Sequence, residues 1–194
     1  MILQAPFRDR AGFGEFLDHV APGGRGVEIG TDRGGFARQL LLSWKSCDAF
    51  WCVDPWITGY DEQDDPPNRR TQVQRDEDEA EARLALAEFP HCHIWKATSI
   101  EAASWHRDPC ELDFVYLDGD HRADAVEADL IAWFPNLKVG GILAGHDFVV
   151  PASARITRNV QRQVRAFAAK MKLDVHLVVE TFADQPWSWY MVKR

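Results

Sequence analysis

The sequence has no closely spaced pair of cysteines and no excess of basic residues. Its four cysteines, Cys47, Cys52, Cys92 and Cys110, include no CxxC spacing, so zinc-knuckle and thioredoxin-like redox sites are not expected. The 30 acidic residues outnumber the 22 lysines and arginines and give a formal net charge of −8. Because nucleic-acid binding usually needs a basic face, we expect no nucleic-acid partner.

Long apolar runs are also missing. No stretch approaches the roughly 20 apolar residues that a membrane-spanning helix needs, so we expect no membrane association. Residues 1–6 lack the basic and then apolar pattern of a secretory signal. Together with cysteines that fit reduced, buried thiols, these features favour a cytoplasmic protein. Without repeats or low-complexity tracts, residues 1–194 are expected to form one domain. The sequence leaves self-association into a homo-oligomer open.

What the sequence does contain is an alternation of short β-rich runs with segments of helical period. This alternation is typical of an α/β sheet with helices on both faces. Strands are expected at 26–30, 50–53, 93–96, 112–117, 142–144, 175–180 and 189–192. The short polar link between the last two predicts an antiparallel hairpin at the sheet edge. The predicted fold class is therefore α/β, with a doubly wound, seven-stranded, mostly parallel sheet and an antiparallel last strand.

Residues 56–75 differ from the rest of the chain. They include four acids, two prolines and three arginines and show little periodicity. A loop of this length is expected to be either a solvated excursion or a lid over a pocket. Helical period resumes near Glu77, with Ala80, Leu84 and Ala87 expected to face the core.

Glycines and polar side chains gather where the first three predicted strands end. In an open parallel sheet, ligands bind beyond the carboxyl ends of the strands, near the switch in strand order. Gly30 and Gly34 have no Cβ and can let the backbone approach a nucleoside closely. Asp54, about 20 residues further on, suits the two hydroxyls of a ribose, and Ser99 can bond an adenine edge. Each residue also has a purely structural interpretation. The glycines could form a plain turn, Asp54 could belong to an Asp-Pro turn, and Ser99 could cap the following helix.

A second polar group follows the fourth and fifth predicted strands. It contains Asp118, Asp120, His121, His146 and Asp147. Carboxylate oxygens, with water in the remaining coordination positions, are typical ligands of Mg²⁺ or Mn²⁺. His146 could bind the metal directly, which would favour Mn²⁺ or another transition metal. Alternatively, it could contact the metal ligands without binding the metal itself. The structural alternative is a set of loop caps and satisfied histidines, but such clusters often mark a metal or acid/base centre.

These motifs resemble those of the class I S-adenosylmethionine-dependent methyltransferases. The resemblance is strongest to the macrocin/mycinamicin-type group of small, metal-dependent O-methyltransferases. The matching segments are Val27-Glu28-Ile29-Gly30 with Gly34, Val53-Asp54-Pro55-Trp56, Leu117-Asp118-Gly119-Asp120-His121, Asp129-Leu130, Leu137-Lys138-Val139-Gly140-Gly141 and His146-Asp147.

The resemblance implies a Rossmann-like methyltransferase fold with S-adenosyl-L-methionine as the cofactor. The residues implied to bind the cofactor are Glu28, Gly30, Thr31, Gly34, Asp54 and Ser99. The implied reaction is methyl transfer to a hydroxyl of a small-molecule acceptor such as a sugar, a phenol or a natural product.

The resemblance also implies a role for the second polar group. Asp118 and Asp147 are implied to hold Mg²⁺ or Mn²⁺, and His146 is a third candidate ligand. His121 is implied to be the general base, so that His121 and Asp118 form the catalytic pair.

Two other classes of function share part of this pattern. A nicotinamide oxidoreductase would have the same strand–glycine–helix start and the same acidic residue for the ribose. It would leave the second polar group, called the acid–histidine group below, unexplained. A non-catalytic module that binds S-adenosylmethionine would need no metal. A metal-dependent hydrolase is less attractive, because it would leave the nucleoside features unused.

Overall fold

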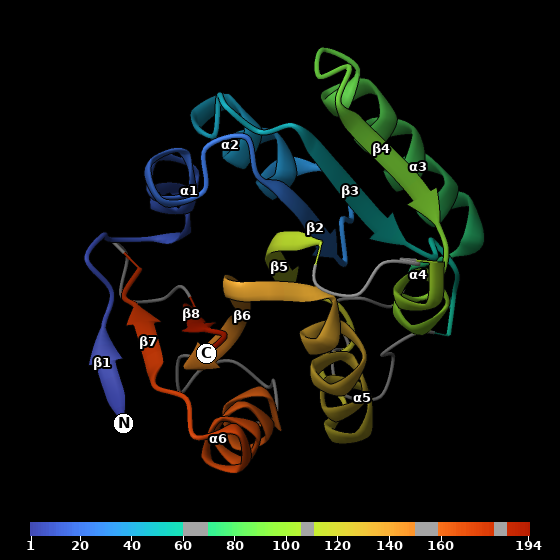
Figure 1. The fold of residues 1–194 in the computed structure, drawn as a ribbon. Coiled ribbons are helices and arrows are strands. Elements are labelled where there is room, and N and C mark those ends of the chain that lie inside the picture. The colour runs from blue at the N-terminus through green and yellow to red at the C-terminus, as the bar shows by residue number, and fades with distance from the viewer. Residues whose placement is uncertain (60–69, 106–110, 150–158, 181–185) are drawn as a thin grey trace.

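The computed structural model describes residues 1–59, 70–105, 111–149, 159–180 and 186–194 (Figure 1). The elements in chain order are β1 (Ile2–Gln4), η1 (Arg10–Gly12), α1 (Phe13–Val20), β2 (Arg25–Ile29), α2 (Gly35–Ser43), β3 (Ala49–Asp54), α3 (Gln72–Leu86), β4 (Cys92–Lys96), α4 (Ser99–Trp105), β5 (Leu112–Leu117), α5 (Ala123–Trp133), η3 (Phe134–Asn136), β6 (Leu137–Val149), α6 (Asn159–Met171), β7 (Val175–Val178) and β8 (Trp187–Val192).

The strands form one eight-stranded sheet in the order β1-β7-β8-β6-β5-β2-β3-β4. Of the strands in the described segments, β8 alone runs opposite to its neighbours, β6 and β7. The predicted α/β class and the reversed last strand are therefore confirmed. The order changes direction at β2, which pairs with β3 on one side and β5 on the other. Ligands of such sheets bind at this switch point.

The helices cover both faces of the sheet (Figure 1). α1 and α2 pack on one face through Phe13, Leu40 and Trp44, and the end of α3 joins them. α5 and α6 pack on the other face through Leu130 and Val164, and α4 lies beside α5. No helix within the described ranges combines the length and the apolar character needed to cross a bilayer.

The N-terminal segment adds elements that the sequence pattern did not reveal. β1 pairs in parallel with β7, so the predicted β7–β8 hairpin does not form the sheet edge. The sheet consequently has eight strands instead of seven. A strand of three residues is too short to show a period of two, and its side chains are all exposed. β6 is also longer than predicted and includes residues 145–147, where its pairing with β8 becomes irregular.

α3 begins earlier than predicted and turns a different face inward. Thr71 and Gln74 form a capping box at its start, so residues 72–75 are helical and not part of a loop. The predicted lid lies largely at 60–69, outside the described residues. The buried positions of α3 are Asp78, Ala82 and Leu86, whereas Ala80, Leu84 and Ala87 are exposed. The prediction was wrong because a buried acid, Asp78, occupies the inner face.

Candidate functional site

A cavity of about 220 Å³ opens beyond the carboxyl ends of β2, β3 and β5. Five of the predicted site residues line it, namely Gly30, Asp54, Ser99, Asp118 and His121. Its position is the switch point of the sheet, as expected for an open parallel sheet. The structure therefore places residues from both predicted groups on one cavity.

Five predicted site residues are absent from the described lining of this cavity. Glu28, Thr31, Gly34 and Asp147 are not among the described residues that line it. His146 lines a much smaller adjoining cavity, of about 20 Å³. The two cavities share part of their lining, namely Gly119, Asp120, His121 and Asp129.

Gly30 is required by the packing of two strand ends. Its φ is +87°, and a Cβ built there would lie 2.0 Å from the main-chain oxygen of Asp118. The amide of Asp118 donates to the carbonyl of Ile29 at 2.8 Å, so β2 and β5 remain in close contact up to the site. Gly30 therefore lies against the main chain of Asp118, whereas the sequence predicted a close approach to a nucleoside.

Gly34 packs against α3, whereas the sequence predicted a close approach to a nucleoside. Its φ is +76°, and a Cβ there would meet Leu86 and Ala82 of α3 at 3.2–3.3 Å. Gly34 precedes the first residue of α2 and lets this turn pack against α3. Its side of the turn faces the helix layer, so the nucleoside interpretation of Gly34 gains no support from the geometry.

Replacing Gly30 with alanine is expected to destabilise the fold strongly. The left-handed backbone and the clash with Asp118 should together lower the free energy of unfolding by roughly 3 kcal/mol or more. Gly35→Ala is the matched control, because a Cβ at that position would meet nothing within 4 Å. This control should leave stability unchanged or raise it by up to about 1 kcal/mol. Urea unfolding of both variants tests this, and equal stabilities would contradict the packing argument.

Asp54 ends β3 and is held by two backbone amides. Its Oδ1 accepts from the amide of Trp56 at 2.8 Å, and its Oδ2 accepts from the amide of Asp32 at 3.0 Å. Burial raises the pKa of Asp54, although these two hydrogen bonds oppose the shift. The Asp-Pro turn and the ligand-facing interpretation are therefore both compatible with the structure, because the carboxylate shapes the turn and still lines the cavity.

The hydroxyl of Ser99 forms hydrogen bonds with two neighbouring side chains. It donates to Asp129 Oδ1 at 2.5 Å and accepts from Trp133 Nε1 at 2.9 Å. It does not cap α4, because Thr98 exchanges hydrogen bonds with Glu101 at that position. Ser99 therefore links α4 to α5, and the carboxylate it positions, Asp129, becomes part of the cavity wall.

Glu28 and Thr31 carry polar atoms that are buried without a hydrogen-bond partner among the described residues. These atoms are Glu28 Oε2 and Thr31 Oγ1. Glu28 is 1% exposed, and burial together with the nearby Asp118 raises its pKa well above the usual value. A buried carboxyl oxygen without a hydrogen-bond partner is a group that a polar or cationic ligand would stabilise.

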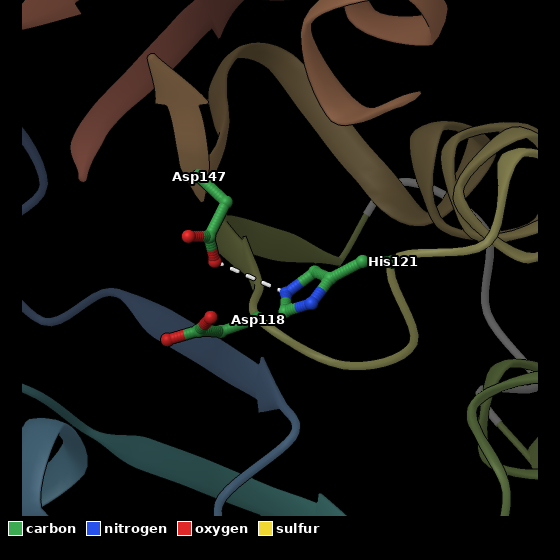
Figure 2. Close-up of side chains that lie close together, drawn as sticks. All are labelled: Asp118, His121 and Asp147. Carbon is green, nitrogen blue, oxygen red and sulfur yellow. Dashed lines mark ion pairs between the residues drawn. The ribbon is translucent and has the colours of Figure 1, made fainter. Parts of the chain in front are cut away.

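Asp118, His121 and Asp147 converge on one point (Figure 2). One potential ligand atom from each lies within 4.8 Å of the other two. Asp118 follows β5, His121 lies three residues later, and Asp147 comes from the neighbouring β6. His121 Nε2 is 3.0 Å from Asp147 Oδ2. Adjacent parallel strands therefore bring Asp118, His121 and Asp147 of the predicted second polar group together, whereas Asp120 pairs with Arg122.

His146 contacts this group from the other side. Its Nδ1 lies 3.2 Å from Asp147 Oδ2 and 3.8 Å from Asp118 Oδ1. Burial lowers the pKa of His146, but Asp118 and Asp147 outweigh burial and raise it. Burial likewise opposes the charge of Asp147, yet the two histidines hold its pKa well below the usual range. The group thus attracts positive charge, which is what a cation site requires.

Arg10 reaches the same group and was not predicted. Its Nη1 lies 3.4 Å from Asp118 Oδ2, and its backbone amide donates to Glu180 Oε1 at 3.1 Å. The guanidinium also lies 5.6 Å from the centre of the Phe36 ring. A single arginine in a non-periodic segment gives no sequence signal, so only the fold shows that this cation neighbours Asp118.

The described part of the predicted lid region forms a charged border beside the cavity. Trp56 is fully buried, and its Nε1 donates to the carbonyl of Asp32 at 2.8 Å. Arg70 pairs with both Asp32 and Asp78. Of the three arginines of this region, Arg70 is paired and Arg75 lines the cavity, whereas Arg69 lies outside the described residues.

Comparisons with known proteins agree with this geometry. Residues 27–148 match the model of a family described as "Methyltransferase domain". No curated protein matches the chain at a significant level. Among solved structures, an O-methyltransferase from Bacillus cereus in complex with SAH is similar, with a TM-score of 0.65 and 14% identity over 93% of this chain and 80% of that one.

Two further structures show the same architecture. A SAM-dependent O-methyltransferase from Thermotoga maritima gives a TM-score of 0.64 at 15% identity, over 98% of this chain and 66% of that one. The N-methyltransferase NodS from Bradyrhizobium japonicum gives 0.61 at 13% identity, over 95% of each chain. At such identities the likeness shows the fold alone, and the fold accommodates both oxygen and nitrogen acceptors.

Proposed function

The chain belongs to the methyltransferase domain family, and from this premise we propose that it transfers a methyl group from S-adenosyl-L-methionine to a hydroxyl of a small acceptor, with help from a divalent metal. One observation supports this most. Residues suited to a nucleoside, Gly30 and Asp54, share a cavity with Asp118 and His121 of the acid–histidine group. A methyl donor and an activated acceptor must meet at such a junction.

The charge of the cavity fits this donor. Five of the lining residues are aspartates, namely Asp32, Asp54, Asp118, Asp120 and Asp129, and Arg75 is the basic residue among the described lining. A negative cavity attracts a sulfonium cation and disfavours polyanions such as phosphates. This supports a neutral, hydroxylated acceptor and argues against nucleic acid. Asp54 would bind the ribose hydroxyls of the donor.

The residue types of the acid–histidine group are those that bind a divalent cation. It supplies two carboxylates and an imidazole at close range, and the two carboxylates raise the pKa of His146, which supports a site for positive charge. Asp118 and Asp147 would hold Mg²⁺ or Mn²⁺, with His146 beside them. A bound cation would stabilise the negative charge that develops on the acceptor oxygen.

His121 would accept the proton of the acceptor hydroxyl. As the oxygen forms its bond to the methyl carbon, the carbon–sulfur bond breaks and its electron pair stays on sulfur. The released proton goes to the imidazole of His121, which lines the cavity. Asp147 Oδ2, 3.0 Å from His121 Nε2, would stabilise the imidazolium that forms. Holding donor and acceptor in line supplies much of the acceleration.

Binding and transfer assays test the proposal in two stages. Calorimetry should show binding of S-adenosylhomocysteine and none of NADH. With labelled S-adenosylmethionine, a screen of sugars, phenols and natural-product alcohols should find an acceptor, and EDTA should abolish transfer until Mg²⁺ is added. Preferential NADH binding would instead support a nicotinamide oxidoreductase. Transfer that survives EDTA would remove the metal from the proposal, and binding without transfer to any acceptor would favour a non-catalytic module.

A further inference from the structure

The outward face of α3 carries an apolar stripe. Its members share one side of the helix and are all exposed, namely Val73, Ala80, Leu84 and Ala87. The exposed fractions of the two large side chains, Val73 and Leu84, are 66% and 80%. α3 lies at the margin of the molecule beside the edge strand β4 (Figure 1), and its buried residues, Asp78, Ala82 and Leu86, lie on the opposite side of the helix. The helical period of the sequence is therefore present, but its apolar side faces away from the sheet.

The spacing of this stripe matches the contact line of a coiled coil. When Glu77 and Leu84 are given position a of a heptad, position d falls on Val73, Ala80 and Ala87. Apolar residues at a and d are usually buried against a second helix. Single exposed apolar side chains are ordinary, but an apolar line at heptad spacing indicates a helical partner.

We propose that α3 pairs with α3 of a second copy of this chain, as an antiparallel helix pair with two-fold symmetry. The axis passes between Glu77 and Ala80, so that Leu84 of each copy packs on Val73 of the other. A two-fold interface uses the same surface on both copies, which a single self-complementary helix can supply. The small side chain of Ala80 lets the two helices approach closely near the axis.

The charges beside the stripe favour the antiparallel orientation. Asp76 and Arg83 lie along one border, and Gln74 and Glu81 lie along the other. In an antiparallel pair, each border faces the same border of the second copy, so Asp76 meets Arg83 and Gln74 meets Glu81. In a parallel pair, opposite borders would meet, and Asp76 would face Glu81. Glu77 would then also face Glu77 of the second copy, so like charges oppose the parallel pair.

Arg83 can reach a second copy without leaving its partner within the chain. Its Nε and Nη2 donate to Glu79 Oε1 at 2.9 and 2.8 Å. A guanidinium has five N–H donors, so further donors are present for Asp76 of the second copy.

The apolar surface continues past Ala87 into a groove of about 350 Å³, whose lining includes Phe89 and Ile94. In the antiparallel pair this groove lies beside the start of α3 of the second copy, which adds contact area. The seam nevertheless contains two alanines and Glu77, so its apolar area is small. A reversible dimer is therefore expected, in place of a permanent one.

The first test measures self-association of the full chain by sedimentation velocity. Over roughly 1 to 500 μM, dimers should form with a dissociation constant of roughly 1 to 100 μM, as expected for a small interface. Leu84→Glu should weaken dimerisation at least about 100-fold, because the dimer loses two buried leucines and gains two buried charges. Val139→Glu is the matched control, since Val139 is 76% exposed but lies in β6. A chain that stays monomeric throughout, or equal dimerisation of Leu84→Glu and the wild type, would overturn the inference.

The second test examines the orientation by exchanging charges. Asp76→Arg and Arg83→Asp should each weaken dimerisation roughly 10-fold, because each change replaces two ion pairs with like charges. The double variant restores both pairs and should dimerise like the wild type. In a parallel pair, Asp76→Arg would instead strengthen dimerisation by relieving the contact with Glu81. That result, or a double variant no better than the single ones, would contradict the antiparallel pair.

Circular dichroism of the variants should match the wild type, because the exchanged residues are exposed. Neither test needs a cofactor or an acceptor, so their outcome is independent of the proposed function.

Discussion

Substitution of Asp147 by asparagine is expected to lower methyl transfer by roughly 100- to 1000-fold, the scale of losing acid/base and metal assistance. Asp147 is 5% exposed and is the shared partner of His121 and His146. Asparagine keeps its shape but removes the charge that orients both rings and would hold the cation. It also tolerates the left-handed backbone at this residue, where φ is +57°, so the fold should survive.

Two measurements check this expectation. The kcat/KM for the acceptor found in the screen should fall, and calorimetric titration with Mn²⁺ should show a weaker site. Asp113→Asn is the matched control, because Asp113 lies at the opposite end of β5 and pairs with Lys138 instead. If Asp147→Asn retained wild-type transfer and Mn²⁺ affinity, the proposed metal centre would be wrong.

The same Mn²⁺ titration separates the roles of the two histidines. His121→Ala should lower kcat and leave Mn²⁺ affinity nearly unchanged, because His121 is proposed as the proton acceptor. His146→Ala should weaken Mn²⁺ binding, because its Nδ1 approaches both Asp118 and Asp147. The opposite result would assign His121 to the metal, a role that its place in the close group with Asp118 and Asp147 also permits.

Replacing Asp54 with alanine is expected to weaken binding of S-adenosylhomocysteine by roughly 100-fold. Two hydrogen bonds from ribose hydroxyls to a charged, largely buried carboxylate are lost, each contributing about 1.5 kcal/mol. The loss of its bonds to the amides of Asp32 and Trp56 should also loosen the turn. Asp54→Asn keeps one acceptor oxygen and should have an intermediate affinity.

Ligand analogues separate the ribose contact from the shape of the turn. Removing the ribose hydroxyls from the ligand should weaken binding to the wild type but not to Asp54→Ala, as in a double-mutant cycle. Asp48→Asn, an exposed change just before β3, should behave like the wild type. If the dehydroxylated ligand lost as much affinity for Asp54→Ala as for the wild type, Asp54 would be a turn residue only.

The sequence predicted the positions of the site residues best where these residues lie at the ends of strands. Asp118 follows β5 and Asp147 lies in the paired β6, so parallel pairing alone brings them together. The contact of Gly30 with the main chain of Asp118 follows from the register of β2 with β5. Such contacts are predictable because a strand order and an alternating pattern are enough to place them.

Other features depend on tertiary contacts that leave no local pattern. The inner face of α3 was misplaced because Asp78 is buried against Arg33 and Arg70, which hydrophobic periodicity cannot show. The role of Ser99 changed because its partners, Asp129 and Trp133, lie 30 and 34 residues away in the chain. Arg10 reaches Asp118 across 108 residues. Each case pairs a polar group with a partner that only the fold can identify.

The N-terminal segment has a consequence for the design of chimeras. The family match spans residues 27–148, yet Arg10 borders the acid–histidine group, and its backbone amide is hydrogen-bonded to Glu180. β1 is paired with β7, and the amide of Ala5 continues that ladder by donating to Leu177 at 2.8 Å. Homologues should therefore be recombined with residues 1–12 and 175–192 exchanged as a set, since splicing at the family boundaries would separate the arginine from the carboxylates it accompanies.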